Sequence, residues 1–111
     1  AWIALPTEAE DADPWFAHHG EGDQPTYDNQ GLFARLVAGE AYGAAAKVQT
    51  SSPLFYVHWE LAEGVRTTPP PPAGKAGGYA ERALYVVRGE IEVGDQVIRA
   101  GQMAVLEPTA E

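Results

Sequence analysis

The sequence predicts an all-β fold, and three observations support this prediction. Short apolar stretches, in which residues alternate between two faces, recur along the chain, and turns rich in Gly and Pro separate them. No stretch has the apolar periodicity of an amphipathic helix. The 111 residues are enough for one domain with a modest core. Together these features favour an antiparallel β-barrel or sandwich.

The first part of the chain reads mainly as a connection. Ala1 to Leu5 is a short apolar run that Pro6 stops, and we expect a strand there. Residues 7–30 are polar and contain prolines and glycines, which is typical of a long surface connection.

The middle of the chain contains two strand candidates. Leu32 to Val37 lies between Gly31 and Gly39. Leu54 to Leu61 alternates strictly between two sets of side chains, which predicts two faces of one strand. One face carries Phe55, Val57, Trp59 and Leu61, and the other carries Leu54, Tyr56, His58 and Glu60.

Four further strands are expected after residue 80: Ala83 to Val87, Ile91 to Val93, Val97 to Ile98, and Met103 to Leu106. Gly94-Asp95 lies between two alternating runs, and Gly accepts a positive φ there, so we predict a tight hairpin. The side chains expected to be mostly buried are Phe55, Val57, Trp59, Ile91, Val93 and Val105.

Charge and composition limit the partners. The 16 Asp and Glu against 7 Lys and Arg give a formal charge of −9, which disfavours a nucleic-acid partner. No apolar run approaches the roughly 18 residues of a membrane span. The chain has no cysteine, which excludes disulfides, thiolate catalysis and cysteine-type zinc sites in it and fits a cytoplasmic location.

One long stretch, RALYVVRGEIEVGDQVIRAGQMAVLEP from Arg82 to Pro108, resembles the second half of pirin-family proteins in the cupin superfamily. Three upstream pieces agree in order: Trp2-Ile3-Ala4-Leu5-Pro6, then Asp13-Pro14-Trp15-Phe16-Ala17-His18-His19, then Leu36-Val37-Ala38-Gly39-Glu40-Ala41-Tyr42-Gly43. The resemblance covers nearly the whole chain. It implies a cupin-type antiparallel β-barrel or jelly roll.

The resemblance also implies a domain organisation and a function. Residues 1–30 would be a connecting segment with an N-terminal strand, and residues 31–111 part of a C-terminal cupin domain, incomplete at its C-terminus. Pirins are two-cupin proteins whose iron site, three histidines and a glutamate, lies in the first cupin. We therefore expect iron or another divalent metal in a missing N-terminal cupin, which is also the expected partner, and quercetin 2,3-dioxygenase-type oxidation by the parent protein. The alternative is a non-catalytic, transcription-cofactor-like module that binds another protein; whether the parent is an enzyme is left open.

No position of this chain matches the family's iron ligands, so we assign it no catalytic, cofactor-binding or metal-binding residue. A metal-binding cupin carries a His-x-His pair where this chain has Tyr79-Ala80-Glu81. Glu81 would need convergent imidazoles to hold a metal, and Arg82 beside it would repel the cation. We expect Arg82 to make a bidentate contact with a carboxylate.

The histidines are weak candidates for ligands. His18 and His19 are neighbours, and adjacent side chains of an extended backbone point to opposite sides. His58 is expected to point outward, opposite Trp59. A stand-alone metal site would require Glu81 to meet His58 or His18, and nothing in the spacing supports that.

Two loop motifs have plain structural interpretations. The prolines at 69–72 favour polyproline II, which could dock on an aromatic groove, but we expect a stiff crossing between strands. The glycines at 74, 77 and 78 do not form a phosphate-binding loop, because Lys75 does not close the run.

Overall fold

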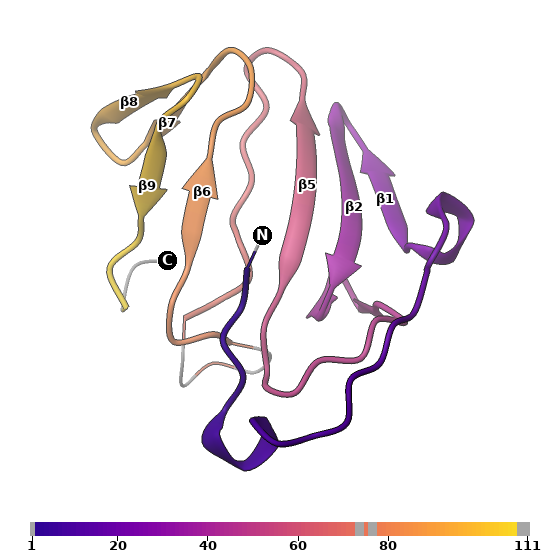
Figure 1. The fold of residues 1–111 in the computed structure, drawn as a ribbon. Helices are drawn as coiled ribbons and strands as arrows, with labels where there is room; N and C mark the ends of the chain where they lie inside the picture. Colours follow the sequence, from indigo (N-terminus) through magenta and orange to yellow (C-terminus); the bar gives the residue numbers. More distant parts are fainter. Residues whose placement is uncertain (1, 73–74, 76–77, 109–111) are drawn as a thin grey trace. The chain divides into compact units, whose positions relative to one another are not determined.

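The computed structural model describes residues 2–72, 75 and 78–108. Within these ranges the regular elements are nine β-strands and two 3-10 turns (Figure 1), which confirms the all-β prediction. The turns are η1 (Thr7–Ala9) and η2 (Glu21–Asp23), and the strands are β1 (Thr26–Asn29), β2 (Leu32–Ala38), β3 (Glu40–Ala41), β4 (Ala44–Ala45), β5 (Tyr56–Leu61), β6 (Ala83–Tyr85), β7 (Glu90–Val93), β8 (Gln96–Arg99) and β9 (Met103–Val105). The chain divides into two units, residues 1–67 and residues 68–111.

The first unit is built around the antiparallel sheet β1-β2-β5 (Figure 1). Its centre is β2, whose alternate residues Leu32, Ala34, Leu36 and Ala38 are buried because successive side chains point to opposite faces. On the same face, Leu61, Trp59 and Val57 of β5 pair with the first three of these residues and are half-buried. This face forms the core of the unit.

Strand β1 lies inside the segment that the sequence predicted to be a connection. Its residues, Thr26–Asn29, are polar or aromatic and all exposed, so no apolar alternation marked them. The strand forms because Gln30 and Gly31 both adopt a positive φ, which suits a two-residue hairpin turn into β2.

A glycine ends β2 for a steric reason. Gly39 has a φ of +81°, and a Cβ added there would lie 2.1 Å from the carbonyl oxygen of Leu54. Only Gly fits at this position. Just before it, the register of β2 against β5 shifts between Leu36 and Ala38, a β-bulge that places Ala38 opposite Tyr56.

The second unit contains two antiparallel pairs, β6-β9 and β7-β8. Val93 pairs with Gln96 across Gly94-Asp95, and Gly94 has a φ of +62°, so the predicted hairpin is confirmed. The pairing of β6 continues past its last residue, because the backbone N–H of Val86 donates to Gln102 and that of Gly101 donates to Val86. Val86 is buried.

The burial prediction was wrong for Val105, which is 79% exposed. It shares a face of the β6-β9 pair with Ala83, Tyr85 and Met103, which are exposed as well, while Leu84 and Ala104 on the other face are half-buried. Both faces of β9 are apolar in sequence, so alternation did not identify the inner one. Phe55, Val57, Trp59, Ile91 and Val93 are half-buried, and the buried residues of β2 were not anticipated.

The strand expected at the N-terminus does not form over residues 2–5, which belong to no regular element; Ala1 lies outside the described residues. The next regular element after these residues is the 3-10 turn η1, at Thr7–Ala9. The division of the chain at residues 30 and 31 into a connection and a cupin domain stays a prediction. In the described part of the chain, no helix has the length and apolar character needed to cross a membrane.

Candidate aromatic site and the sequence-predicted residues

Three aromatic side chains meet on the core face of the first unit. Tyr27 of β1 and Trp59 of β5 both pair with Ala34 of β2, so the three residues form one row across the sheet. Paired residues of an antiparallel sheet project to the same face. Ala34 is only 1% exposed. Its small side chain leaves space between the two larger aromatic residues of the row.

A fourth element adds a ring to this row. Tyr42 lies on the turn between β3 and β4, and its ring stacks on that of Tyr27, with centroids 5.1 Å apart and planes 13° from parallel. The indole N–H of Trp59 donates a hydrogen bond to the Tyr42 hydroxyl oxygen. Tyr42 has a φ of +54°, an unfavourable value for a bulky residue, so the surrounding contacts hold it there.

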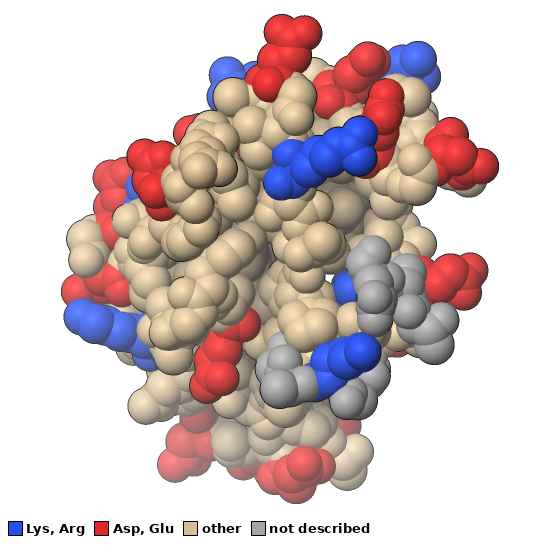
Figure 2. Space-filling view, turned by 180° about the vertical axis from the view of Figure 1, so that it is seen from behind, with Lys and Arg blue, Asp and Glu red and all other residues tan. Residues whose placement is uncertain are grey.

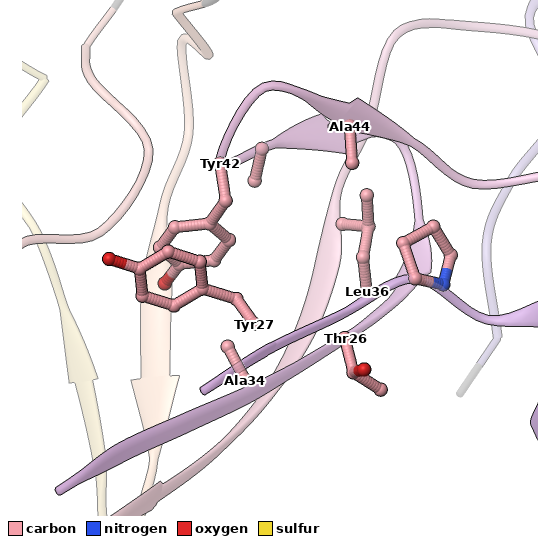
Figure 3. A pocket seen from close by; sticks show the side chains of 8 residues that line it. Thr26, Tyr27, Ala34, Leu36, Tyr42 and Ala44 are labelled. Atoms are coloured by element: carbon pink, nitrogen blue, oxygen red, sulfur yellow. The ribbon is translucent and has the colours of Figure 1, made fainter. Parts of the chain in front are cut away.

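Beside the two tyrosines is a small recess, shown in Figure 3. It is lined only by uncharged residues: Pro25, Thr26, Tyr27, Ala34, Leu36, Ala41, Tyr42 and Ala44. Its volume is about 40 Å³, enough for a water molecule or a methyl-sized group but well below the roughly 300 Å³ of an ordinary ligand pocket. The recess is therefore too small to hold a flavonol-sized substrate.

Burial raises the pKa of Tyr42 above its ordinary value of 10.0, and the nearby Tyr27 adds to this, while the bond from Trp59 opposes it. The phenol therefore stays protonated at neutral pH. The contacts of the cluster pack the β3-β4 turn against the sheet.

His58 lies on the face opposite Trp59, as the alternation predicted. Its Nε2 lies 3.5 Å from Oε1 of Glu60 on the same strand, and both side chains are about half exposed. Across the sheet His58 pairs with Arg35, whose guanidinium binds the Glu21 carboxylate at 3.0 Å. The cation opposite His58 is thus already paired with a carboxylate.

Glu81 and Arg82 lie just before β6 and behave differently. Glu81 is exposed, whereas Arg82 is only 4% exposed. Its Nη1 donates to the carbonyl oxygen of Pro70 at 3.1 Å, and its Nη2 to that of Glu107 at 3.4 Å. These bonds join the two flanks of the second unit; the expected contact with a carboxylate stays a prediction.

The proline run lies between β5 and β6, and the stiff crossing that we favoured stays a prediction. Pro70 and Pro72 are buried, so they are not presented for docking, and the backbone N–H of Tyr79 donates to Pro71. Gly74 and Gly77, expected not to form a phosphate loop, lie outside the described residues.

In the described ranges, no three side chains of His, Asp or Glu come together in a way that could hold a metal ion. His18 is exposed and His19 half-buried in the segment before η2, and His58 lies on the outer face of β5. The donor set of an iron site, which needs convergent imidazoles, does not fit the residues present.

Comparison with known proteins identifies the family. The chain is 50% identical over 97% of its length to a pirin-like protein of Caulobacter vibrioides. The chain belongs to the pirin family. It is also 32% identical over 95% of its length to a protein of Pseudomonas aeruginosa named "Putative quercetin 2,3-dioxygenase", and 25% identical over 95% to pirin of Rattus norvegicus.

The chain spans about a third of these relatives: 36% of the Caulobacter and rat proteins and 31% of the Pseudomonas protein. No family model and no solved structure matched it. Membership agrees with the all-β antiparallel structure, so the cupin-type fold predicted from the sequence is confirmed.

Sequence reasoning missed the aromatic cluster. Tyr27 lies in a segment predicted to be a loop, and Tyr42 is unremarkable in sequence beside Gly43. The available signal was the Tyr-Gly pair between short apolar runs, because Gly at the second position of a two-residue turn favours a hairpin.

Proposed function

We propose that this chain is the metal-free half of a two-cupin pirin, and that the other half carries an iron site for quercetin 2,3-dioxygenase-type oxidation. The observation that carries the proposal is the 32% identity to the Pseudomonas protein over nearly the whole chain, although the chain covers only 31% of that protein. Most of such a protein therefore lies outside this sequence. A metal site there agrees with the lack of a donor cluster in the residues described here.

In this proposal the chain contributes no catalytic residue. Its role is to fold stably and to pack beside the metal-bearing domain. The buried face of β2 and the buried Arg82 stabilise its fold. Iron bound in that other domain would supply the oxidation chemistry at its open coordination positions. The three histidines of this chain take no part.

The test uses the protein at its full natural length. We expect near-stoichiometric iron or another divalent metal by elemental analysis after dialysis, and oxygen uptake when quercetin is added. The variants His58→Ala and Glu81→Gln in this chain should leave both unchanged. Metal loss on either substitution would place the site in this chain instead, and a full-length protein without bound metal and without oxygen uptake would exclude the enzyme.

The second candidate is a non-catalytic module that binds another protein, and the formal charge of −9 favours it, because such a surface complements a basic partner. Figure 2 shows Asp and Glu side chains exposed at the surface of the chain. Reading the gene on both sides of this segment separates the two functions. A His-x-His pair with a later His and Glu supports the metal enzyme, and their loss supports the binding module.

We also propose a cytoplasmic location and partners other than nucleic acid or membrane. The absence of cysteine from the sequence and the acidic charge support these assignments.

A further inference from the structure

The N-terminal part of the first unit exposes large apolar side chains in two groups. Trp2 and Phe16 are each 89% exposed, and Trp15 is 63% exposed. Ile3 and Leu5 are more than half exposed. Single exposed apolar residues are common on proteins, but aromatic residues concentrated in one short segment mark an interaction surface.

This segment, residues 2–16, has little support of its own. It contributes to no strand, and its regular structure is the single turn η1. That turn is closed by the backbone N–H of Ala9 donating to Pro6 at 2.9 Å, and the N–H of Ala12 then donates to Ala9 at 3.1 Å. The turn separates the group at 2–5 from the group at 15–16.

The stretch between the two apolar groups is acidic. Glu8, Glu10, Asp11 and Asp13 are all exposed, and no Lys or Arg occurs in the sequence before Arg35. A surface that covers this segment must therefore offer apolar pockets for the aromatic rings and cations for the carboxylates between them.

We propose that residues 2–16 form a docking segment, and that the occupant is the remaining domain of the same polypeptide, through an apolar surface rimmed by Lys or Arg. This inference rests on the two-cupin arrangement proposed above. The 50% identical relative is nearly three times as long as this chain, so the family members provide ample surface for such a contact within one molecule.

Trp2 and Phe16 are the anchors in this arrangement, since they are the most exposed of the five side chains and aromatic anchors dominate most interfaces. The acidic residues between them set orientation and attract the basic rim. Added salt consequently weakens the ionic part of the contact, whereas it does not weaken the burial of the two rings.

The test is hydrogen exchange on the protein at its full natural length. We expect the amides of residues 2–16 to exchange at least tenfold more slowly than in an unfolded chain. The double variant Trp2→Ala, Phe16→Ala should lose this protection, and Tyr85→Ala, which removes a 58% exposed ring from the second unit, should keep it. Glu10→Lys should reduce protection, and the matched charge change Glu63→Lys in the turn after β5 should not.

If the amides of residues 2–16 exchange at unfolded-chain rates in the unmodified full-length protein, the proposal that this segment docks is wrong. If protection arises only when a separate basic protein is added, the proposal that the remaining domain of the same polypeptide covers the segment is wrong. Metal analysis is read independently: iron without protection contradicts this inference alone, and protection without iron contradicts the proposed enzyme alone.

Discussion

The rings of Tyr27 and Tyr42 stack with their centroids 5.1 Å apart, although one residue lies on a sheet strand and the other on a hairpin turn. The stack fixes the β3-β4 hairpin against the sheet, and the hydrogen bond from Trp59 fixes the same ring from the other strand. A backbone conformation that a tyrosine rarely adopts is thereby maintained at Tyr42.

The first prediction separates the hydroxyl from the ring. Tyr42→Phe keeps the stack but removes the acceptor of the Trp59 N–H, so we expect a loss of about 0.5–1.5 kcal/mol in the free energy of unfolding. Tyr42→Ala should cost more, because it also removes an aromatic pair worth about 0.5–1.5 kcal/mol beyond its buried area. Urea denaturation measures both, with Tyr56→Phe on the outer face of β5 as the control. A Tyr42→Phe protein as stable as the parent would contradict the role of the hydroxyl.

The second prediction concerns pH. Because burial raises the pKa of Tyr42 in the folded state, the folded protein holds this proton more tightly than the unfolded chain. The stability from this group is complete below the unfolded pKa of about 10 and is lost as the pH rises through the folded pKa. Unfolding followed between pH 8 and 11 should show an alkaline loss of stability that is smaller in Tyr42→Phe than in Tyr56→Phe. Equal losses in the two variants would assign the effect to other groups.

A third prediction uses two glycines that share a positive φ but differ in their surroundings. Gly43 has open space where a Cβ would lie, so Gly43→Ala should cost only the left-handed backbone, about 1–2 kcal/mol. Gly39→Ala adds a clash with the carbonyl oxygen of Leu54 and should lower the thermal midpoint further. If the two substitutions proved equally costly, the close approach of Leu54 would have no energetic role.

The fourth prediction concerns the buried cation of the second unit. Arg82→Met removes the donors to the Pro70 and Glu107 carbonyls, and we expect a loss of about 1–3 kcal/mol in the free energy of unfolding. Arg82→Lys keeps the charge but not the two-pronged donor geometry, so it should fall between Arg82→Met and the parent protein. Arg88→Met, at an exposed position, serves as the control in chemical denaturation. A stable Arg82→Met protein would show that these bonds are dispensable.

The strands visible in the sequence were short apolar runs, either alternating or bounded by turn residues. Leu32 to Val37 was predicted almost to its ends from the glycines that bound it, and Leu54 to Leu61 from its alternation, which is typical of a half-buried strand. Strand β1 was missed because its four exposed residues pair through backbone bonds to β2, a tertiary contact that leaves no apolar signature.

The aromatic site was less predictable than the fold. Its members come from three separate elements, and Tyr42 and Trp59 are 17 residues apart. Only the register that places both Tyr27 and Trp59 opposite Ala34 brings them together, and register depends on the assembled sheet. His58, by contrast, was placed correctly, because the side to which it points follows from the parity of one strand.

The position of Arg82 has a consequence for the order of folding events. Its guanidinium reaches a carbonyl 12 residues earlier and another 25 residues later, so both flanks must arrive before the cation can leave water. We therefore expect the bonds to form after the folding barrier rather than before it. In that case their strength sets how slowly the second unit opens, and hence how long it resists proteases, and leaves the speed of its assembly almost unchanged.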